Sequence, residues 1–138
     1  MAGTVTQSTE TYTTGSGYSA SIVKVVTLNF TGSHDDGTVP DTDLAADLKG
    51  FSLYSIEYYP GLVAPDTADV TVLNEAGLDL LGAKGASLIT AATKAISFPY
   101  SAFSGLYFYP IINSALTVSI ANQDTIDATW SLVLTFKQ

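Results

Sequence analysis

Residues 21–30 read SIVKVVTLNF, and this stretch decides the fold class. It is dense in β-branched and aromatic residues, which favour extended backbone, and its side chains alternate between two faces as in a β-strand. The face that carries Ile22, Val26, Leu28 and Phe30 is the more apolar one, so we expect it to point into the core. The rest of the sequence supplies the partner strands that such a half-buried strand needs.

Three further segments have the same alternation. Residues 51–59, FSLYSIEYY, alternate cleanly and end at Pro60 and Gly61, which break a strand. Residues 115–122, ALTVSIAN, and residues 128–136, ATWSLVLTF, each place apolar side chains on one face. The short polar stretch between the last two predicts that they form a closing hairpin.

Residues 69–85, DVTVLNEAGLDLLGAKG, admit two readings. Gly77 and Gly82 have the spacing that opens a phosphate-binding loop, but that motif needs Lys directly after the second glycine and a hydroxyl residue after the Lys. Here Ala83 follows the second glycine and Gly85 follows the lysine, so the chemistry of a nucleotide site is missing.

The alternative reading of this stretch is a hairpin, which we favour. Gly77 would permit a positive φ at the turn, and Leu78 and Leu80 would return to the core. Asp79 would point outward and hydrogen-bond to nearby backbone, which is a structural role.

Two segments are less regular. Residues 32–43 are rich in acidic and turn residues and predict a surface loop, followed by one helical turn over residues 43–50. Residues 85–96 fit a short helix or a strand, since alanines and β-branched residues favour opposite structures. We therefore expect an all-β, single-domain antiparallel β-sandwich, jelly-roll-like, over residues 18–138, preceded by an extended N-terminal arm, residues 1–17.

The arm is rich in threonine and serine and carries too little apolar area to offset its own ordering entropy. It should be ordered only where it adds as a strand to a sheet edge, in its own sheet, in a sister subunit or in a capsid protein. Intermolecular pairing is the hypothesis we favour, because backbone hydrogen bonds supply affinity there without charged side chains.

Composition excludes several classes of partner. The 138 residues carry thirteen carboxylates, five lysines and no arginine, for a net charge of −8, so direct binding to nucleic acid or to anionic membranes is not expected. The first residues have no secretory pattern, which predicts synthesis in a host cytoplasm. Charged residues make up only 13% of the chain, and a surface with few charges loses little hydration energy when another protein covers it.

Catalytic and metal sites are not evident either. The single histidine, His34, lies between Ser33 and Asp35 in sequence, but a triad needs these groups to converge from a rigid scaffold. A set of loop carboxylates offers oxygen ligands for calcium without the spacing of a known calcium loop. These are Asp35, Asp36, Asp41 and Asp43. We expect no enzyme activity, no cofactor and no metal.

Aromatic residues give the clearest sign of a binding role. Residues 98–110, FPYSAFSGLYFYP, hold six aromatic side chains, and alternation places Tyr107 and Tyr109 on one face with Phe108 on the other. Three readings stay open: the rings cap the sandwich, bury against another protein, or stack on sugars. The residues that we predict at a partner interface are Val5, Tyr12, Tyr18, Tyr107 and Tyr109.

Residues 56–82, IEYYPGLVAPDTADVTVLNEAGLDLLG, resemble a pattern found in small bacteriophage virion proteins, and the segments around residues 115–136 are similar to their closing strands. The chain departs from that pattern before the last strand, where Ala128 and Thr129 stand in place of a frequent glycine. The matching positions are Val70, Thr71, Val72, Gly77, Asp79, Leu80, Leu81 and Gly82.

The resemblance implies a β-sandwich, often a jelly roll, that decorates the outside of a capsid. The function it implies is that of a decoration (cement) protein that binds between capsomers, with the major capsid protein and further copies of itself as partners. The alternative is a phage tail or receptor-binding module that recognises host-surface glycans through Tyr107 and Tyr109.

Overall fold

The computed structural model describes residues 2–15, 17, 20–101 and 104–138, and within them it contains β-strands and no α-helix. None of the described residues belongs to a helix long and apolar enough to cross a membrane. The strands are β1 (Thr4–Thr14), β2 (Ser21–Thr31), β3 (Thr42–Asp43), β4 (Ser52–Pro60), β5 (Thr67–Leu73), β6 (Ile89–Thr90), β7 (Ala95–Ser97), β8 (Tyr100–Ser101), β9 (Leu106–Tyr107), β10 (Thr117–Ala121) and β11 (Thr129–Lys137).

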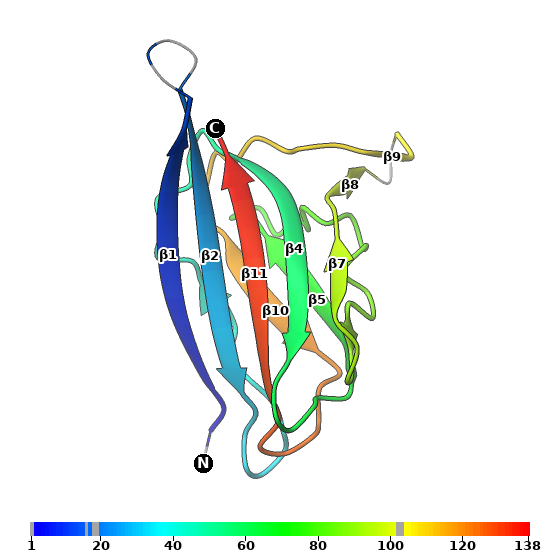
Figure 1. Cartoon of the computed structure of the whole chain (residues 1–138). Helices are drawn as coiled ribbons and strands as arrows, with labels where there is room; N and C mark the ends of the chain where they lie inside the picture. The colour runs from blue at the N-terminus through cyan, green and yellow to red at the C-terminus, as the bar shows by residue number, and fades with distance from the viewer. Residues whose placement is uncertain (1, 16, 18–19, 102–103) are drawn as a thin grey trace.

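These strands form two main sheets that lie face to face (Figure 1). One sheet has the order β1-β2-β11-β4-β7, and the other has the order β3-β10-β5-β6. Strands β8 and β9 pair only with each other. All of the pairings are antiparallel, so the expected all-β sandwich is confirmed.

The connectivity is that of a jelly roll. Strand β2 pairs with β11, β3 with β10, β4 with β7, and β5 with β6, as in one long antiparallel hairpin that has been rolled into two sheets. Strand β1 is added beside β2, and β8 and β9 are inserted between β7 and β10. The jelly-roll-like architecture expected from the sequence is therefore the one observed.

The core lies between the two sheets, where alternate side chains of each strand meet. In β2, Val26, Leu28 and Phe30 are buried, as predicted. The ring of Phe30 stacks on that of Trp130 from β11, with centroids 5.0 Å apart. In β4 the simple alternation fails, because a register shift against β11 lets both Leu53 and Ile56 point inward.

The predicted closing hairpin is wrong. Strand β10 belongs to the four-stranded sheet, where it pairs with β3 and β5, and β11 lies in the five-stranded sheet between β2 and β4. The polar connection between them crosses from one sheet to the other. Its Gln123 is buried and bonds to the backbone of Gly37, Asp66 and Thr125 in three loops, which fixes this crossing.

The stretch after β5 makes the predicted turn. Gly77 has a φ of 81°, and Leu73 and Asp79 form an antiparallel bridge across the turn. The Asp79 carboxylate accepts hydrogen bonds from the backbone N–H groups of Val72, Leu81 and Ala83, at 3.0–3.1 Å, which confirms its local structural role.

The core contact expected of Leu78 in this turn is wrong: Leu78 is exposed, Leu80 packs partly against the core, and the fully buried residue is Leu81. After the bridge at Asp79 the chain continues in turns as far as residue 87, so the second strand of the predicted hairpin does not form.

Two less regular segments are also resolved. The helical turn expected over residues 43–50 does not form, since this stretch holds part of β3 followed by bends and a turn. Leu44 and Leu48 reach the core from this non-helical stretch. Residues 85–96, which fitted a helix or a strand, contain the short strand β6 and the start of β7, with turns before and between them and no helix.

The N-terminal arm is an edge strand of its own sheet. Residues Thr4 to Thr14 pair with Thr31 to Ser21 of β2 without interruption. The hypothesis that the arm pairs with another molecule, and not with its own sheet, is wrong. The edge of β2 offers the arm the same backbone hydrogen bonds without a second chain. Gln7 also donates to the Asp43 carbonyl and accepts from the Ala45 N–H, which ties β1 to the other sheet. The domain boundary at residue 17 stays a prediction.

Candidate interaction surfaces

Residues 98–111, named here the aromatic insertion, hold the largest concentration of exposed apolar side chains in the described chain. The insertion leaves the sandwich after β7, turns through β8 and β9, and extends away from the sheets before returning to β10 (Figure 1). Its exposed members are Phe98, Leu106, Tyr107, Phe108, Tyr109 and Ile111.

Ring contacts hold the insertion in place. The ring of Tyr109 stacks on that of Tyr54 in β4, with centroids 4.0 Å apart and planes 4° apart. Tyr107 meets Tyr100 and Phe98 edge to face, at 5.1 and 6.5 Å. Tyr107 and Tyr109 nevertheless stay 62% and 53% exposed, so most of their area is open to a partner.

Lysines lie over two of these rings. The ammonium group of Lys84 is 4.4 Å from the centroid of Tyr100, and that of Lys137 is 4.9 Å from Tyr54. Each contact is a cation–π interaction, which holds the ring and places a positive charge beside an otherwise apolar surface. A partner with carboxylates at the rim of its own apolar patch would be complementary to this arrangement.

The remaining predicted interface residues lie elsewhere. Val5 is partly buried against the core, whereas Tyr12 is about half exposed on the same strand, β1. The hydroxyl of Tyr12 donates to the Glu10 carboxylate, and this bond raises the pKa of the phenol. Tyr18 falls outside the described residues. Because β1 and β7 are opposite edges of the five-stranded sheet, the structure does not bring β1 and the aromatic insertion together.

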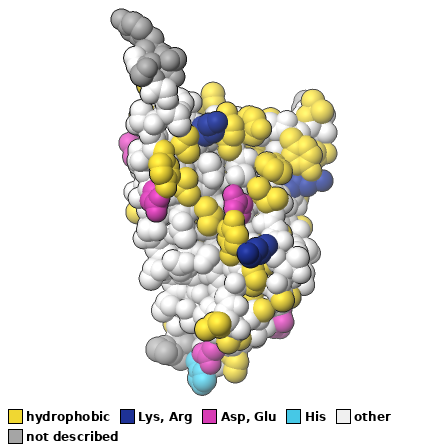
Figure 2. Space-filling model, viewed as in Figure 1, with side chains coloured by type: hydrophobic (Ala, Val, Ile, Leu, Met, Phe, Trp, Pro, Cys, Tyr) yellow, Lys and Arg dark blue, Asp and Glu magenta, His cyan; other side chains and the backbone are white. Residues whose placement is uncertain are grey.

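The outer face of the five-stranded sheet carries residues that sequence reasoning missed. Ile96 and Tyr59 are exposed there, and with Glu57, Lys94 and Ala95 they line a pocket of about 420 Å³. Tyr59 donates a hydrogen bond to the Glu57 carboxylate, which raises the pKa of Tyr59. Figure 2 shows hydrophobic side chains gathered over the upper part of this face, with few charges between them.

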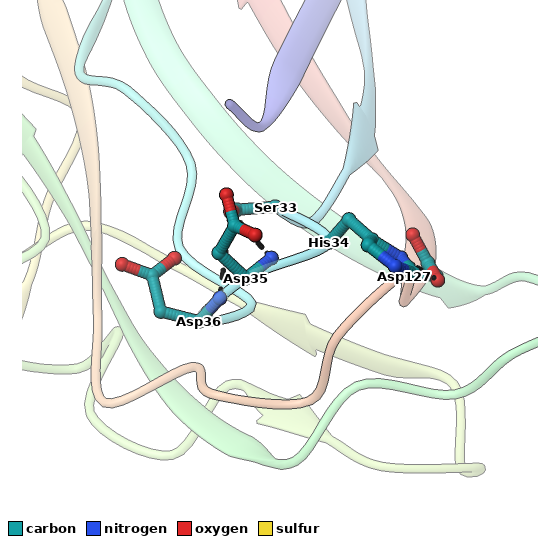
Figure 3. A network of polar contacts seen from close by, with 5 residues as sticks. All are labelled: Ser33, His34, Asp35, Asp36 and Asp127. Carbon is teal, nitrogen blue, oxygen red and sulfur yellow. Dashed lines mark hydrogen bonds and ion pairs between the residues drawn. The ribbon is translucent and has the colours of Figure 1, made fainter. Parts of the chain in front are cut away.

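The loop around His34 does not form a catalytic arrangement (Figure 3). Ser33 accepts the backbone N–H groups of Asp35 and Asp36 and so closes the turn. His34 turns away from it toward Asp127, with Nδ1 2.8 Å from a carboxylate oxygen, in an exposed pair. The serine and the histidine therefore serve separate loop contacts.

The acidic residues of the same loop are held apart by local bonds. Asp36 accepts from the hydroxyl and the N–H of Thr38, and these bonds lower the pKa of Asp36. Asp43 accepts from the hydroxyl of Thr117. In the part of the chain that the structure describes, no group of three or more His, Cys, Asp or Glu side chains is placed to hold a metal ion. The absence of enzyme activity and of a metal requirement stays a prediction.

Comparison with known proteins gives no family assignment. No protein-family model and no curated protein sequence matches the chain. Among solved structures, the chain is similar to one described as "Cyanophage Pam1 capsid asymmetric unit", with 14% sequence identity and a TM-score of 0.39. The alignment covers 99% of this chain and 86% of that chain. A likeness at this level assigns no function and no partner to the chain.

Proposed function

We propose that the chain is a structural protein of a bacteriophage virion, made in the host cytoplasm, that decorates the capsid exterior. It binds the major capsid protein between capsomers and stabilises the shell as a cement protein. The observation that carries the proposal is the aromatic insertion, an extended segment with exposed rings that its own fold leaves uncovered. The resemblance of residues 56–136 to small phage virion proteins supplies the capsid as the partner.

Such a role needs binding and no chemistry. Interfaces are rich in aromatic residues because a tyrosine combines a large apolar area with a hydroxyl that tolerates water. An interface of about 800 Å² on each partner is the usual size for a stable complex, and copies repeated over a shell reinforce one another. The low charge of the chain limits the hydration energy that such contacts cost.

The proposal is tested by pelleting the purified protein with expanded and unexpanded shells of its phage. The variant is Leu106→Ser combined with Tyr107→Ser, which removes exposed apolar area and no core contact. We expect the wild-type protein to bind expanded shells and to raise their melting temperature. We expect the double variant to bind at least tenfold more weakly, or about 1.4 kcal/mol.

Leu62→Ser is the matched control. Leu62 is fully exposed in the connection after β4, whereas the insertion contacts the start of β4 through a Ser52 bridge to Ile111. Leu62 is therefore at the opposite end of the sandwich, and its variant should bind shells like the wild type. Equal losses in both variants would mean that binding follows general hydrophobicity, which contradicts a specific docking role for the insertion.

The second candidate is a tail or receptor-binding module for host glycans. The exposure of Tyr107 and Tyr109 favours it, since open tyrosine rings can stack on sugars. The same proteins are titrated with host-surface glycans by calorimetry. Millimolar glycan binding that disappears in the double variant, together with no binding to either form of shell, would contradict the cement function and support this one.

A further inference from the structure

The outer edge of β1 has a row of backbone groups with no partner. In an antiparallel sheet, successive residues direct their N–H and C=O groups alternately to one neighbouring strand and to the other. Beside β2, Gln138 donates its N–H to the Ile22 carbonyl, and Gly32 donates to the Ala128 carbonyl. The even-numbered residues of β2 therefore face β11, and its odd-numbered residues face β1.

This alternation fixes the orientation of β1 as well. Odd-numbered residues of β2 pair with even-numbered residues of β1, as Val23 does with Tyr12. The odd-numbered residues of β1 thus direct their N–H and C=O groups to the free edge, where no group of the described chain hydrogen-bonds to them. These residues are Val5, Gln7, Thr9, Thr11 and Thr13.

Among the described strands only β2 pairs with β1, and the free edge of β1 carries none of the usual protection. Proteins commonly protect sheet edges with short strands, lysine, proline or bulges. The other edge strands of the two sheets follow this rule, since β7 has three residues and β3 and β6 have two each. Strand β1 has eleven residues, no lysine, no proline and no break in its register, and Glu10 is its single charge.

We propose that a second copy of this chain pairs with β1, antiparallel and about a twofold axis at Thr9. Thr9 then faces Thr9 of the partner subunit, Gln7 faces Thr11 of the partner subunit, and Val5 faces Thr13 of the partner subunit. All five outward residues find partners, which gives about ten backbone hydrogen bonds and joins two five-stranded sheets into one.

The sequence of β1 is complementary to itself in this register. On the outer face, Glu10 lies opposite Ser8 of the partner subunit, and Tyr12 lies opposite Thr6 of the partner subunit, so no like charges are directly opposed. A register shifted by two residues leaves outward groups of each chain unpaired. A second copy therefore pairs with every outward residue of β1 and opposes no like charges.

The contact is narrow, so the dimer is weak. Eleven residues span about 35 Å, and pairing along one edge covers less than the roughly 800 Å² per partner of a stable complex. We expect dissociation in the micromolar range or above, strengthened wherever copies are held close together. The inference does not depend on the proposed function, and its test uses the purified chain alone.

Sedimentation velocity from about 5 to about 500 µM measures the dimer, and Thr9→Pro is the variant that blocks it. Proline removes an N–H that faces the free edge, where an edge strand tolerates it. We expect the Thr9→Pro dimer to be at least tenfold weaker, with the melting temperature of the monomer kept within a few degrees. Thr9→Ala keeps the N–H and should dimerise like the wild type.

Cysteine cross-linking tests the register. The chain has no cysteine, so a single substitution reports one distance. Two facing Cα atoms of a hydrogen-bonded pair are about 5.5 Å apart, within the range of a disulfide. Thr9→Cys should therefore form a disulfide-linked dimer under mild oxidation. Thr13→Cys is equally exposed but would lie more than about 25 Å from its own copy and should not.

Three results would overturn the proposal. The first is a wild-type protein that stays monomeric at every concentration, and the second is a dimer that Thr9→Pro leaves unchanged. The third is equal cross-linking of the two cysteine variants. A monomeric protein whose binding to shells is lost in Thr9→Pro would show that a capsid strand occupies the edge in place of a second copy.

Discussion

Replacing the buried side chain of Gln123 should lower the free energy of unfolding of the domain. It is buried, and its amide nitrogen donates to the carbonyls of Gly37 and Thr125 at 2.9 and 2.8 Å. Its amide oxygen accepts from the N–H of Asp66 at 2.9 Å. One side chain thus joins the loops after β2, after β4 and after β10.

Gln123→Met keeps the volume and removes every one of these bonds. The carbonyl of Gly37, a buried residue, loses its partner, whereas the N–H of Asp66 belongs to an exposed residue and can bond to water in its place. An unpaired buried polar group costs about 1–3 kcal/mol, and this is the loss we expect in the free energy of unfolding. For a domain of this size that is a fall of roughly 4–12 °C in melting temperature.

Gln7→Met is the matched control. Gln7 also makes two amide bonds to backbone, at 3.0 and 2.9 Å, but in an exposed position where water replaces them. We expect it to cost less than about 1 kcal/mol. Chemical unfolding of both variants, followed by fluorescence, measures the difference. Equal losses, or a loss below about 1 kcal/mol for Gln123→Met, would refute the reasoning that burial makes these bonds decisive.

Two further changes test other parts of the fold. Asp79→Ala removes the acceptor of three backbone N–H groups and should lower the free energy of unfolding by about 2–3 kcal/mol, whereas Glu75→Ala in the same turn should change it by less than about 0.5 kcal/mol. Burial raises the pKa of Tyr58 to about 12, because the phenolate would lose its hydration, so its contribution to stability is complete below pH 10 and falls as the pH rises toward 12. Denaturant titrations at pH 9 and pH 11.5 should show this fall in the wild type, and it should be smaller in Tyr58→Phe, which lacks the hydroxyl that donates to the Ala91 carbonyl at 2.5 Å.

Much of the fold follows from the sequence because alternation reports directly which face of a strand is buried. Val26, Leu28 and Phe30 lie in the core as predicted, and the jelly-roll-like β-sandwich is as expected. Alternation does not report which sheet a strand joins, however. Strands β10 and β11 are both apolar on one face, and only the buried Gln123 between them distinguishes a crossing from a hairpin.

The candidate surfaces were harder to predict because they depend on the order of strands in the sheet. Exposure of Tyr107 and Tyr109 agrees with the reading that the rings are not all core. The pocket beside Tyr59 and Ile96 combines β4 with β7 and the segment before it, which are far apart in sequence. The sequence places Glu57 and Tyr59 on one face of β4, but these two residues indicate a pocket only once β7 is known to lie beside them.

The position of β11 has a consequence for how the chain folds. This strand is central in the five-stranded sheet, yet its partner β2 precedes it by about a hundred residues, and β4 has no neighbour on that side without it. Contacts so distant in sequence form slowly, since a long loop must close before any pairing is gained. Strands β2 and β4 therefore gain their shared neighbour only when β11 pairs with both of them. We therefore expect the slowest step in the folding of this jelly roll to be the insertion of β11 between two strands that lie far before it in the sequence.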